Sequence, residues 1–306
     1  DGQVAVLQRD QLALLNAATG RPLRETRLDH DNYGIVVPWR TATGVRFVVK
    51  NTEAPYPGCW YGDPTHIYNA DLRAVVTLSR TVGSGHSART FDVDGDGADE
   101  LLIGYEVYGA DGRLRWRMAG EDEAFYDPIL HHDDQIQIGR IEGRLRVVYA
   151  GSTFLYMGTL DGRLCWMSGL GHPQHVLVGN FRGGSKTASL AVLNLQVGPA
   201  LQRFAAETGY SLPVADYANG IVWLRGDGEI VNVVYPPATE PKWLHSGEGI
   251  LIYPQGCPDG SDAVIVRDCG WPRAYDLAGQ EVFTMPCPSP RAGGGDDAPV
   301  GPDGYG

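Results

Sequence analysis

The densest group of potential ligand atoms lies at residues 92–100, which read DVDGDGADE. Acidic side chains occupy alternate positions, and glycines at 95 and 97 permit a tight turn because Gly adopts positive φ without strain. Oxygen ligands spaced in this way suit Ca²⁺, whereas acids this close repel one another without a cation. We predict a structural calcium site, the alternative being a solvated acidic turn. Its ligands would be Asp92, Asp94, Asp96, the Ala98 carbonyl and Glu100.

Histidines form the second chemical signal. Each of three short segments of alternating apolar and polar residues, beginning near residues 89, 135 and 176, is preceded by histidine. Another histidine, His66, begins a segment of its own. Imidazole titrates near pH 6.5, so such groups can give or take a proton at neutral pH. The histidines in front of the three segments are His86, the pair His131 and His132, and His172.

The segments that must position these residues read as β-strands. Apolar and polar residues alternate in runs of four to seven that are cut by Gly, Asp and Asn, and the only helical signal is short, at 199–208. A strand–turn–strand phrase recurs, and its clearest turns, Asp111-Gly112 and Asp161-Gly162, lie 50 residues apart (161 − 111). Asp-Gly favours hairpin turns, and this period is close to that of a four-stranded propeller blade. We therefore predict an all-β repeat protein.

Blade geometry then predicts where the histidines meet. The inner strands of a propeller all start on one face around the central channel, and the turn between strands 2 and 3 opens on that face. On this basis we expect five histidines to share one rim: His66, His86, His131, His132 and His172.

Composition narrows the possible partners. The 306-residue chain has a formal net charge of −12 and a pI near 5.0, which argues against nucleic acid or an anionic membrane surface as partner. No apolar run reaches the roughly 20 residues of a membrane span. We expect one β-propeller domain over residues 1–287 and an irregular, Pro/Gly-rich tail over 288–306.

The five cysteines favour secretion without fixing a disulfide pattern. Cys257 and Cys269 flank a short hairpin-like segment and are spaced to pair, while the odd total leaves at least one thiol free or bound to a metal. A weaker alternative is a structural zinc held by His172 and His175 with Cys165 or Cys269.

Residues 85–100 (GHSARTFDVDGDGADE) and 171–182 (GHPQHVLVGNFR) give the chain a resemblance to β-propeller polysaccharide lyases. These include the rhamnogalacturonan lyases, the propeller ulvan lyases and the rhamnose–glucuronate lyases. The resemblance covers roughly residues 30–200, and its acidic turn is similar to the DxDxDG loops of propellers. It implies about seven four-stranded blades, Ca²⁺ in the acidic loop, and secretion. It also implies cleavage of a rhamnose- and uronate-containing glycan by β-elimination.

The same resemblance implies roles for individual residues. His66 and His86 are twenty residues apart, as in the ulvan and rhamnose–glucuronate branches. They would hold the substrate carboxylate or exchange the C5 proton. His131 or His132, with Tyr126, would act as the partner acid or base. His172 would line the subsite.

Two further substrate contacts are predicted on weaker evidence, and the sequence is compatible with a second function. Trp60 could stack on a sugar ring or fill space between blades. Residues 151–154, where the resemblance implies an arginine, read GSTF, so the nearest candidates are Arg144 and Arg146, in a turn and strand that we place on the other face. Of these we take Arg144 as the predicted substrate contact. The alternative to a lyase is a non-catalytic propeller, without the arginine that the resemblance implies, that binds an anionic polysaccharide or assembles with itself.

Overall fold

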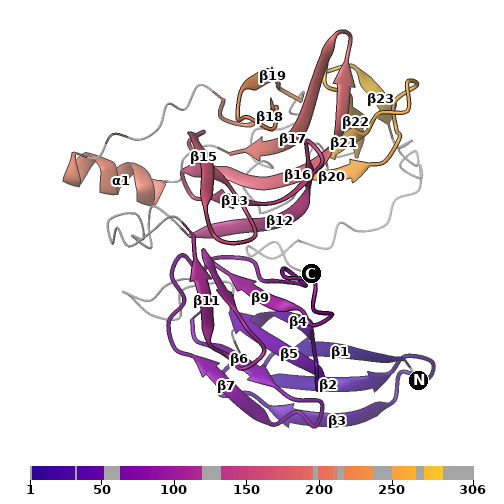
Figure 1. The fold of residues 1–306 in the computed structure, drawn as a ribbon, viewed down its shortest axis with the longest axis vertical. Helices are drawn as coiled ribbons and strands as arrows, with labels where there is room; N and C mark the ends of the chain where they lie inside the picture. The colour runs from indigo at the N-terminus through magenta and orange to yellow at the C-terminus, as the bar shows by residue number, and fades with distance from the viewer. Residues whose placement is uncertain are drawn as a thin grey trace, which may run out of the picture.

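The structure, a computed structural model, describes residues 2–31, 33–51, 63–118, 132–195, 199–209, 211, 217–236, 250–266 and 272–284. Within them the chain forms six antiparallel sheets, one after another along the sequence (Figure 1). Five sheets have four strands and the first has three, and each strand pairs with its neighbour in chain order. The prediction of an all-β fold is confirmed. The resemblance implied about seven sheets, one more than the described residues contain.

The strands have the following bounds. Sheet 1 contains β1 (Gln3–Gln8), β2 (Gln11–Asn16) and β3 (Pro22–Arg27). Sheet 2 contains β4 (Tyr33–Thr41), β5 (Gly44–Asn51), β6 (Thr65–Tyr68) and β7 (Ala74–Leu78). Sheet 3 contains β8 (Arg89–Phe91), β9 (Glu100–Ile103), β10 (Glu106–Tyr108) and β11 (Leu114–Arg117). Sheet 4 contains β12 (Asp133–Ile141), β13 (Arg144–Gly151), β14 (Phe154–Gly158) and β15 (Leu164–Gly169). Sheet 5 contains β16 (Pro173–Gly183), β17 (Lys186–Asn194), β18 (Gly220–Leu224) and β19 (Ile230–Val234). Sheet 6 contains β20 (Ile250–Tyr253), β21 (Ala263–Val266), β22 (Arg273–Tyr275) and β23 (Glu281–Thr284).

The first strands of the sheets lie next to one another. β1 packs on β4, β4 on β8, β12 on β16, and β16 on β20, so the sheets follow an arc from sheet 1 to sheet 6 in a propeller-like order (Figure 1). Because every first strand in this series stands at the inner side of its sheet, residues at the starts of neighbouring first strands can meet.

The recurring Asp-Gly pair forms the turn between the last two strands of sheets 3, 4 and 5. Its glycine has positive φ, for example 88° at Gly162, and a Cβ atom there would lie 2.8 Å from the Trp116 ring of the preceding sheet. The same contact recurs where Gly228 meets Trp166 at 2.9 Å. The turn glycine is thus needed both for its backbone conformation and for packing between sheets.

The apolar core consists of layers between neighbouring sheets. One layer joins sheets 3 and 4 around Tyr105 and Tyr149, and another joins sheets 5 and 6 around Trp223. Between β17 and β18 the predicted helix is confirmed as α1 (Pro199–Thr208), which ends at Gly209 with a φ of 74°. No helix in the described ranges has the length and apolar character needed to cross a bilayer.

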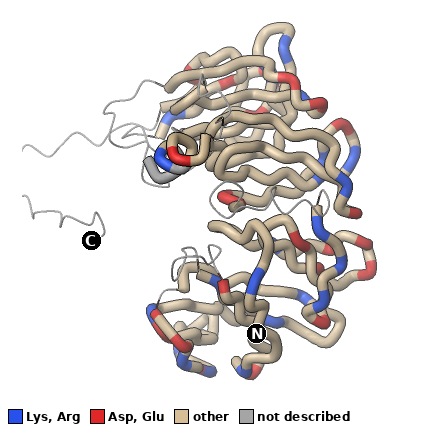
Figure 2. The backbone as a smooth tube through the Cα atoms, turned by 90° about the vertical axis from the view of Figure 1, so that its left-hand side faces the viewer, with Lys and Arg blue, Asp and Glu red and all other residues tan. Residues whose placement is uncertain are grey.

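Charged residues lie mainly on turns and strand ends, with acidic and basic positions interspersed (Figure 2). A polyanion would therefore bind through a local cluster of cationic groups rather than through a broad basic face.

Candidate functional site

Three neighbouring sheets each deliver one histidine from the start of their first strand. His132 directly precedes β12, His172 directly precedes β16, and His86 lies three residues before β8. The three imidazoles approach one carboxylate, that of Asp134, the second residue of β12. These three histidines therefore lie close together, as predicted. We call His86, His132, His172 and Asp134 the histidine cluster.

The segment that carries His86 is fixed by close contact with β12. The His86 amide donates to the Asp133 carbonyl at 2.6 Å, and the Asp133 amide donates to the Gly83 carbonyl at 2.9 Å. A Cβ atom at Gly85 would lie 1.8 Å from the Asp133 carbonyl oxygen, so only glycine permits this approach. The buried Lys50 ammonium donates to the Gly85 carbonyl at 2.5 Å and clamps the segment from sheet 2.

The other two histidines are also held through their backbones. The His132 carbonyl accepts a hydrogen bond from the Ser152 amide at 3.0 Å. The His172 amide donates to the Asn194 side chain at 3.1 Å, and the His172 carbonyl accepts from the Leu195 amide at 2.8 Å. The rings are therefore carried by ordered strand ends.

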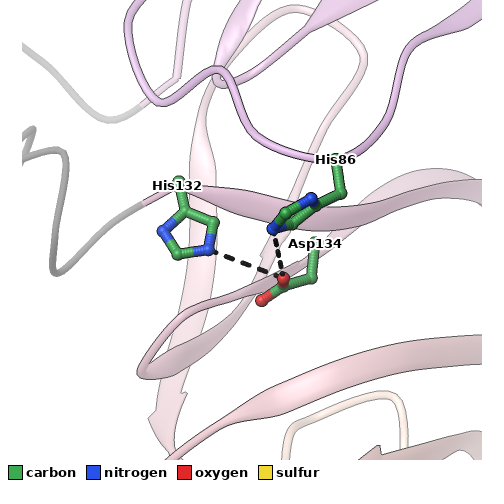
Figure 3. A group of neighbouring side chains, drawn as sticks. All are labelled: His86, His132 and Asp134. Atoms are coloured by element: carbon green, nitrogen blue, oxygen red, sulfur yellow. Dashed lines mark ion pairs between the residues drawn. The ribbon is translucent and has the colours of Figure 1, made fainter. Parts of the chain in front are cut away.

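The distances within the cluster are similar to one another. The Nε2 atoms of His86 and His132 both lie 3.6 Å from Asp134 Oδ1 (Figure 3), and Nε2 of His172 lies 3.7 Å from Oδ2. The His86 and His132 rings meet edge to face with centroids 5.3 Å apart. The Asp134 side chain is 1% exposed, whereas that of His86 is 29% exposed. A buried anion thus lies beneath imidazoles that solvent and ligands can reach.

Two opposing effects set the charge of Asp134. Burial disfavours its carboxylate, but the neighbouring His132, His172 and His86 more than offset this and hold the pKa of Asp134 below its usual value. The adjacent Asp133 is different, because burial raises its pKa to about 7 against the attraction of Lys50. Burial also lowers the pKa of Lys50, to about 8. The cluster therefore holds one firm negative charge, on Asp134.

His66 lies in a second cluster. Its Nε2 is 3.6 Å from Asp29 Oδ2, its Nδ1 is 3.0 Å from the Thr77 hydroxyl, and its ring contacts Tyr33 edge to face. The Tyr33 hydroxyl donates to Asp29 Oδ1 at 2.5 Å. Burial lowers the pKa of His66 despite the nearby Asp29 carboxylate. The contacts of His66 are with sheet 2 and the segment before it, not with Asp134.

The remaining predicted substrate residues do not join the histidine cluster in the described structure. Arg144 pairs with Ile141 at the far end of the β12–β13 hairpin, roughly 23 Å along the strand from Asp134. There it lines a cavity of about 390 Å³ with Glu142, Arg146 and Trp166. Three other predicted residues, Trp60, Tyr126 and His131, lie outside the described residues.

The acidic loop lies at the opposite end of β8 from His86. Asp92 accepts hydrogen bonds from the Gly95 amide at 2.7 Å and the Gly97 amide at 2.9 Å. Glu100 is buried, which raises its pKa, and accepts a bond from the Val93 amide at 3.0 Å. Asp99 pairs with Arg40 at 2.7 Å.

Two groups of side chains in the described residues have the spacing of metal ligands. In each, one ligand atom per residue lies within 4.8 Å of the others. One group is Asp92, Asp94 and Glu100 in the acidic loop, and the other is His86, His132 and Asp134. The first offers only oxygen, whereas the second offers two nitrogens and one oxygen.

The cysteines form neither a disulfide nor a metal site in the described residues. Cys165 is an exposed free thiol and Cys257 a buried one. Cys269, the partner that the spacing allowed for Cys257, lies outside the described residues.

Asp134 is the member of the histidine cluster that sequence reasoning missed. The sequence around it, His131-His132-Asp133-Asp134, placed two acids beside the predicted histidines. Adjacent acids at a strand start usually face solvent, and their burial here depends on sheets 3 and 5 packing on β12.

No known protein family matches the chain, and no curated protein matches its sequence. Solved structures show the fold. The exotype rhamnogalacturonan lyase YesX is 13% identical with a TM-score of 0.56, and the match covers 90% of this chain and 46% of the lyase. The Vibrio cholerae biofilm matrix protein Bap1 is 11% identical with a TM-score of 0.53, covering 93% of this chain and 67% of Bap1.

BBS1N, solved in complex with ARL6DN, is 12% identical with a TM-score of 0.53, covering 94% of this chain and 76% of that one. An enzyme, a matrix protein and a partner-binding protein thus share one class of fold, that of consecutive antiparallel sheets. The fold is compatible with more than one function, so the function of this chain must be argued from its site.

Proposed function

We propose that the protein cleaves a uronic-acid-containing polysaccharide by β-elimination at the histidine cluster. The observation that carries this proposal is the convergence of His86, His132 and His172 on the buried Asp134. Three partly exposed imidazoles around one anion form a centre that can bind a carboxylate and move a proton.

The reaction makes two demands on such a centre. The substrate carboxylate must be neutralised so that the neighbouring C5 proton can leave, and a base must accept that proton. Because imidazole titrates near neutral pH, a cluster of three can hold an imidazolium for the carboxylate and a neutral ring for the proton at the same time.

The similarity to known structures supports a role in polysaccharide chemistry. YesX is a rhamnogalacturonan lyase and Bap1 is a biofilm matrix protein. At 11–13% identity this similarity bears on the fold alone, and the chain spans less than half of YesX. A rhamnose- and uronate-containing glycan and a secreted location are accordingly part of the proposal.

The proposal includes a structural Ca²⁺ ion in the acidic loop. Asp92, Asp94 and Glu100 present oxygen atoms within 4.8 Å of one another, which fits the hard ligand set of Ca²⁺. Asp96 and the Ala98 carbonyl would complete the predicted set. Bound Ca²⁺ would offset the repulsion of these acids and hold the turn between β8 and β9.

The test is the ultraviolet absorbance of unsaturated uronate products released from ulvan, gum arabic and rhamnogalacturonan. We expect a product from at least one of them, and strongly reduced activity in His86→Ala and Asp134→Asn. His175→Ala, in β16 but outside the cluster, is the matched control and should stay active. Absence of product from every uronate glycan, or full activity of both cluster variants, would contradict the proposal.

A non-catalytic glycan-binding or assembling protein is the second candidate. It is favoured by the sequence GSTF at 151–154 and by the position of Arg144 at the far end of the β12–β13 hairpin. Binding of an intact uronate glycan without product, abolished by the same cluster variants, would identify this function.

A further inference from the structure

We infer that His86, His132 and Asp134 form a binding site for a divalent transition-metal ion of the Zn²⁺ or Mn²⁺ type. The three ligand atoms lie within 4.8 Å of one another. They come from two sheets, and Figure 3 shows both imidazoles pointing at the Asp134 carboxylate. The site is distinct from the acidic loop, which lies at the other end of β8.

The distances favour an ion over direct hydrogen bonds. Both Nε2–Oδ1 separations are 3.6 Å, beyond the 2.7–3.2 Å of an N–H···O bond. Two ligands bound about 2.0–2.1 Å from a tetrahedral metal are about 3.3 Å apart. Both N–O separations exceed this value by about 0.3 Å, and the two imidazole nitrogens lie within 4.8 Å of each other, so a metal ion would draw the three side chains together.

The buried carboxylate supplies the second observation. Asp134 is 1% exposed, and its Oδ2 atom has no hydrogen bond among the described residues. The Gln174 amide donates to Oδ1 at 3.2 Å and fixes the orientation of the group. A carboxylate this deeply buried is stable only beside a positive charge, which a metal ion can supply as well as a protonated imidazole.

The ligand types decide the class of metal. Imidazole nitrogen suits Zn²⁺ and other transition metals and a carboxylate also suits Mn²⁺, whereas Ca²⁺ selects oxygen alone. Two imidazoles and one carboxylate leave coordination positions open for a ligand. His172 approaches Asp134 through the other oxygen, Oδ2, at 3.7 Å, and so remains outside this set of three ligands.

A metal ion at this site would take part in the proposed lyase reaction. This catalytic role rests on the proposed function, whereas metal binding itself is independent of it. The ion would take the uronate carboxylate at an open position and neutralise it without any protonated imidazole. His172 would then accept the C5 proton. The C5–H electrons form the C4–C5 double bond, the C4–O bond breaks, and the leaving oxygen takes up a proton from the protonated His172.

The test is titration of the intact, chelator-treated protein with Co²⁺, followed through the visible d–d absorption, with Zn²⁺ as competitor. We expect one equivalent of Co²⁺ to give an intense band that Zn²⁺ abolishes. The band should be absent in His86→Ala and in Asp134→Asn, a nearly isosteric change that keeps the fold. Gln174→Ala, which removes a supporting contact, should weaken binding by about 10–100-fold.

Two controls separate this site from the others. His175→Ala should bind Co²⁺ normally, which also tests the alternative zinc site at His172 and His175, and Asp92→Asn should do so because the acidic loop is a different site. Absence of the band in the wild type, or its persistence in both His86→Ala and Asp134→Asn, would overturn the inference.

The two proposals fail separately. Normal Co²⁺ binding without any lyase product would support the metal site and contradict the proposed function. Lyase activity in chelator-treated protein that binds no Co²⁺ would support the proposed function and contradict the metal site.

Discussion

The acidic loop and the histidine cluster are built in opposite ways. All the acids of the loop lie between residues 92 and 100, and the amides of Gly95 and Gly97 that orient Asp92 belong to the same turn. The cluster joins His86, His132 and His172 from the first strands of three sheets. The loop is local in sequence, whereas the cluster exists only once the sheets have packed.

Because of this difference, we expect the loop and the cluster to have different roles. A local loop can stiffen one hairpin, so its loss should appear mainly in stability. A site assembled from three sheets can present groups with fixed spacing to a ligand, so its loss should appear mainly in chemistry. Four predictions test this separation, from the largest expected effect to the smallest.

Removing one imidazole should affect activity much more than stability. His86→Ala should lower lyase kcat/KM by about 10²- to 10⁴-fold, because a proton-transfer or charge-neutralising group is lost, while the partly exposed ring contributes little to folding. Steady-state kinetics and urea denaturation of the same sample measure both effects. If Asp92→Ala lowered kcat/KM as much as His86→Ala without changing stability, the proposed difference between loop and cluster would be wrong.

Substituting Gly85 should disturb the cluster through the backbone. Gly85→Ala places a methyl group 1.8 Å from the Asp133 carbonyl oxygen, and we expect the free energy of unfolding to fall by about 3 kcal/mol. Gly184→Ala is the control, since a Cβ there meets nothing within 4 Å although φ is +60°. It should cost only about 1–2 kcal/mol. If Gly85→Ala and Gly184→Ala lost the same free energy of unfolding in urea denaturation, β12 would have to move to accommodate the added methyl group.

Calcium should stabilise the folded protein through the loop alone. At a Ca²⁺ concentration of 100 times Kd, the free energy of unfolding should rise by about 2.7 kcal/mol, with a higher Tm in calorimetry. Asp92→Asn should abolish this gain. Asp111→Asn, at an exposed turn acid bonded to the Arg113 amide, should keep it. A calcium effect that survives Asp92→Asn would place the ion elsewhere.

Asp63 offers a buried carboxylate without an imidazole, for comparison with Asp134. Burial raises the pKa of Asp63 to about 6 despite hydrogen bonds from Thr81. Its contribution to stability is therefore full below its usual pKa near 4 and is lost as the pH rises through 6.

Asp63→Asn should reduce the loss of stability between pH 4 and 7 by about 1–2 kcal/mol when urea denaturation is repeated across that range, and Asp133, whose pKa is also raised, accounts for a remaining loss. Asp134, whose pKa is lowered, should behave in the opposite sense. A wild-type protein whose stability does not fall over this range would contradict the assignment to Asp63.

Features encoded by neighbouring residues could be predicted from the sequence. The Asp-Gly turns appear between the last two strands of sheets 3, 4 and 5, and the predicted helix at 199–208 is present. Both depend on short-range patterns of turn residues and periodicity. The positions of His86, His132 and His172 at the starts of first strands followed from the same repeat.

The fate of His66 and the importance of Asp134 could not be read in this way. His66 was expected beside His86; it lies at the start of β6 next to Tyr33 at the start of β4, and its carboxylate partner is Asp29 rather than Asp134. Its sequence distance from His86 fixes neither the tilt of the strand nor the nearest partner. For Asp134 the type of side chain was visible, but its burial was not.

By itself the sequence determined the antiparallel strands, their turns and the acid-rich loop, because each depends on residues a few positions apart. Only the tertiary structure decided that three histidines from three sheets surround one carboxylate and that this carboxylate is shielded from water. The physical reason is that burial and the distances between imidazoles are set by how whole sheets pack, which no single segment encodes.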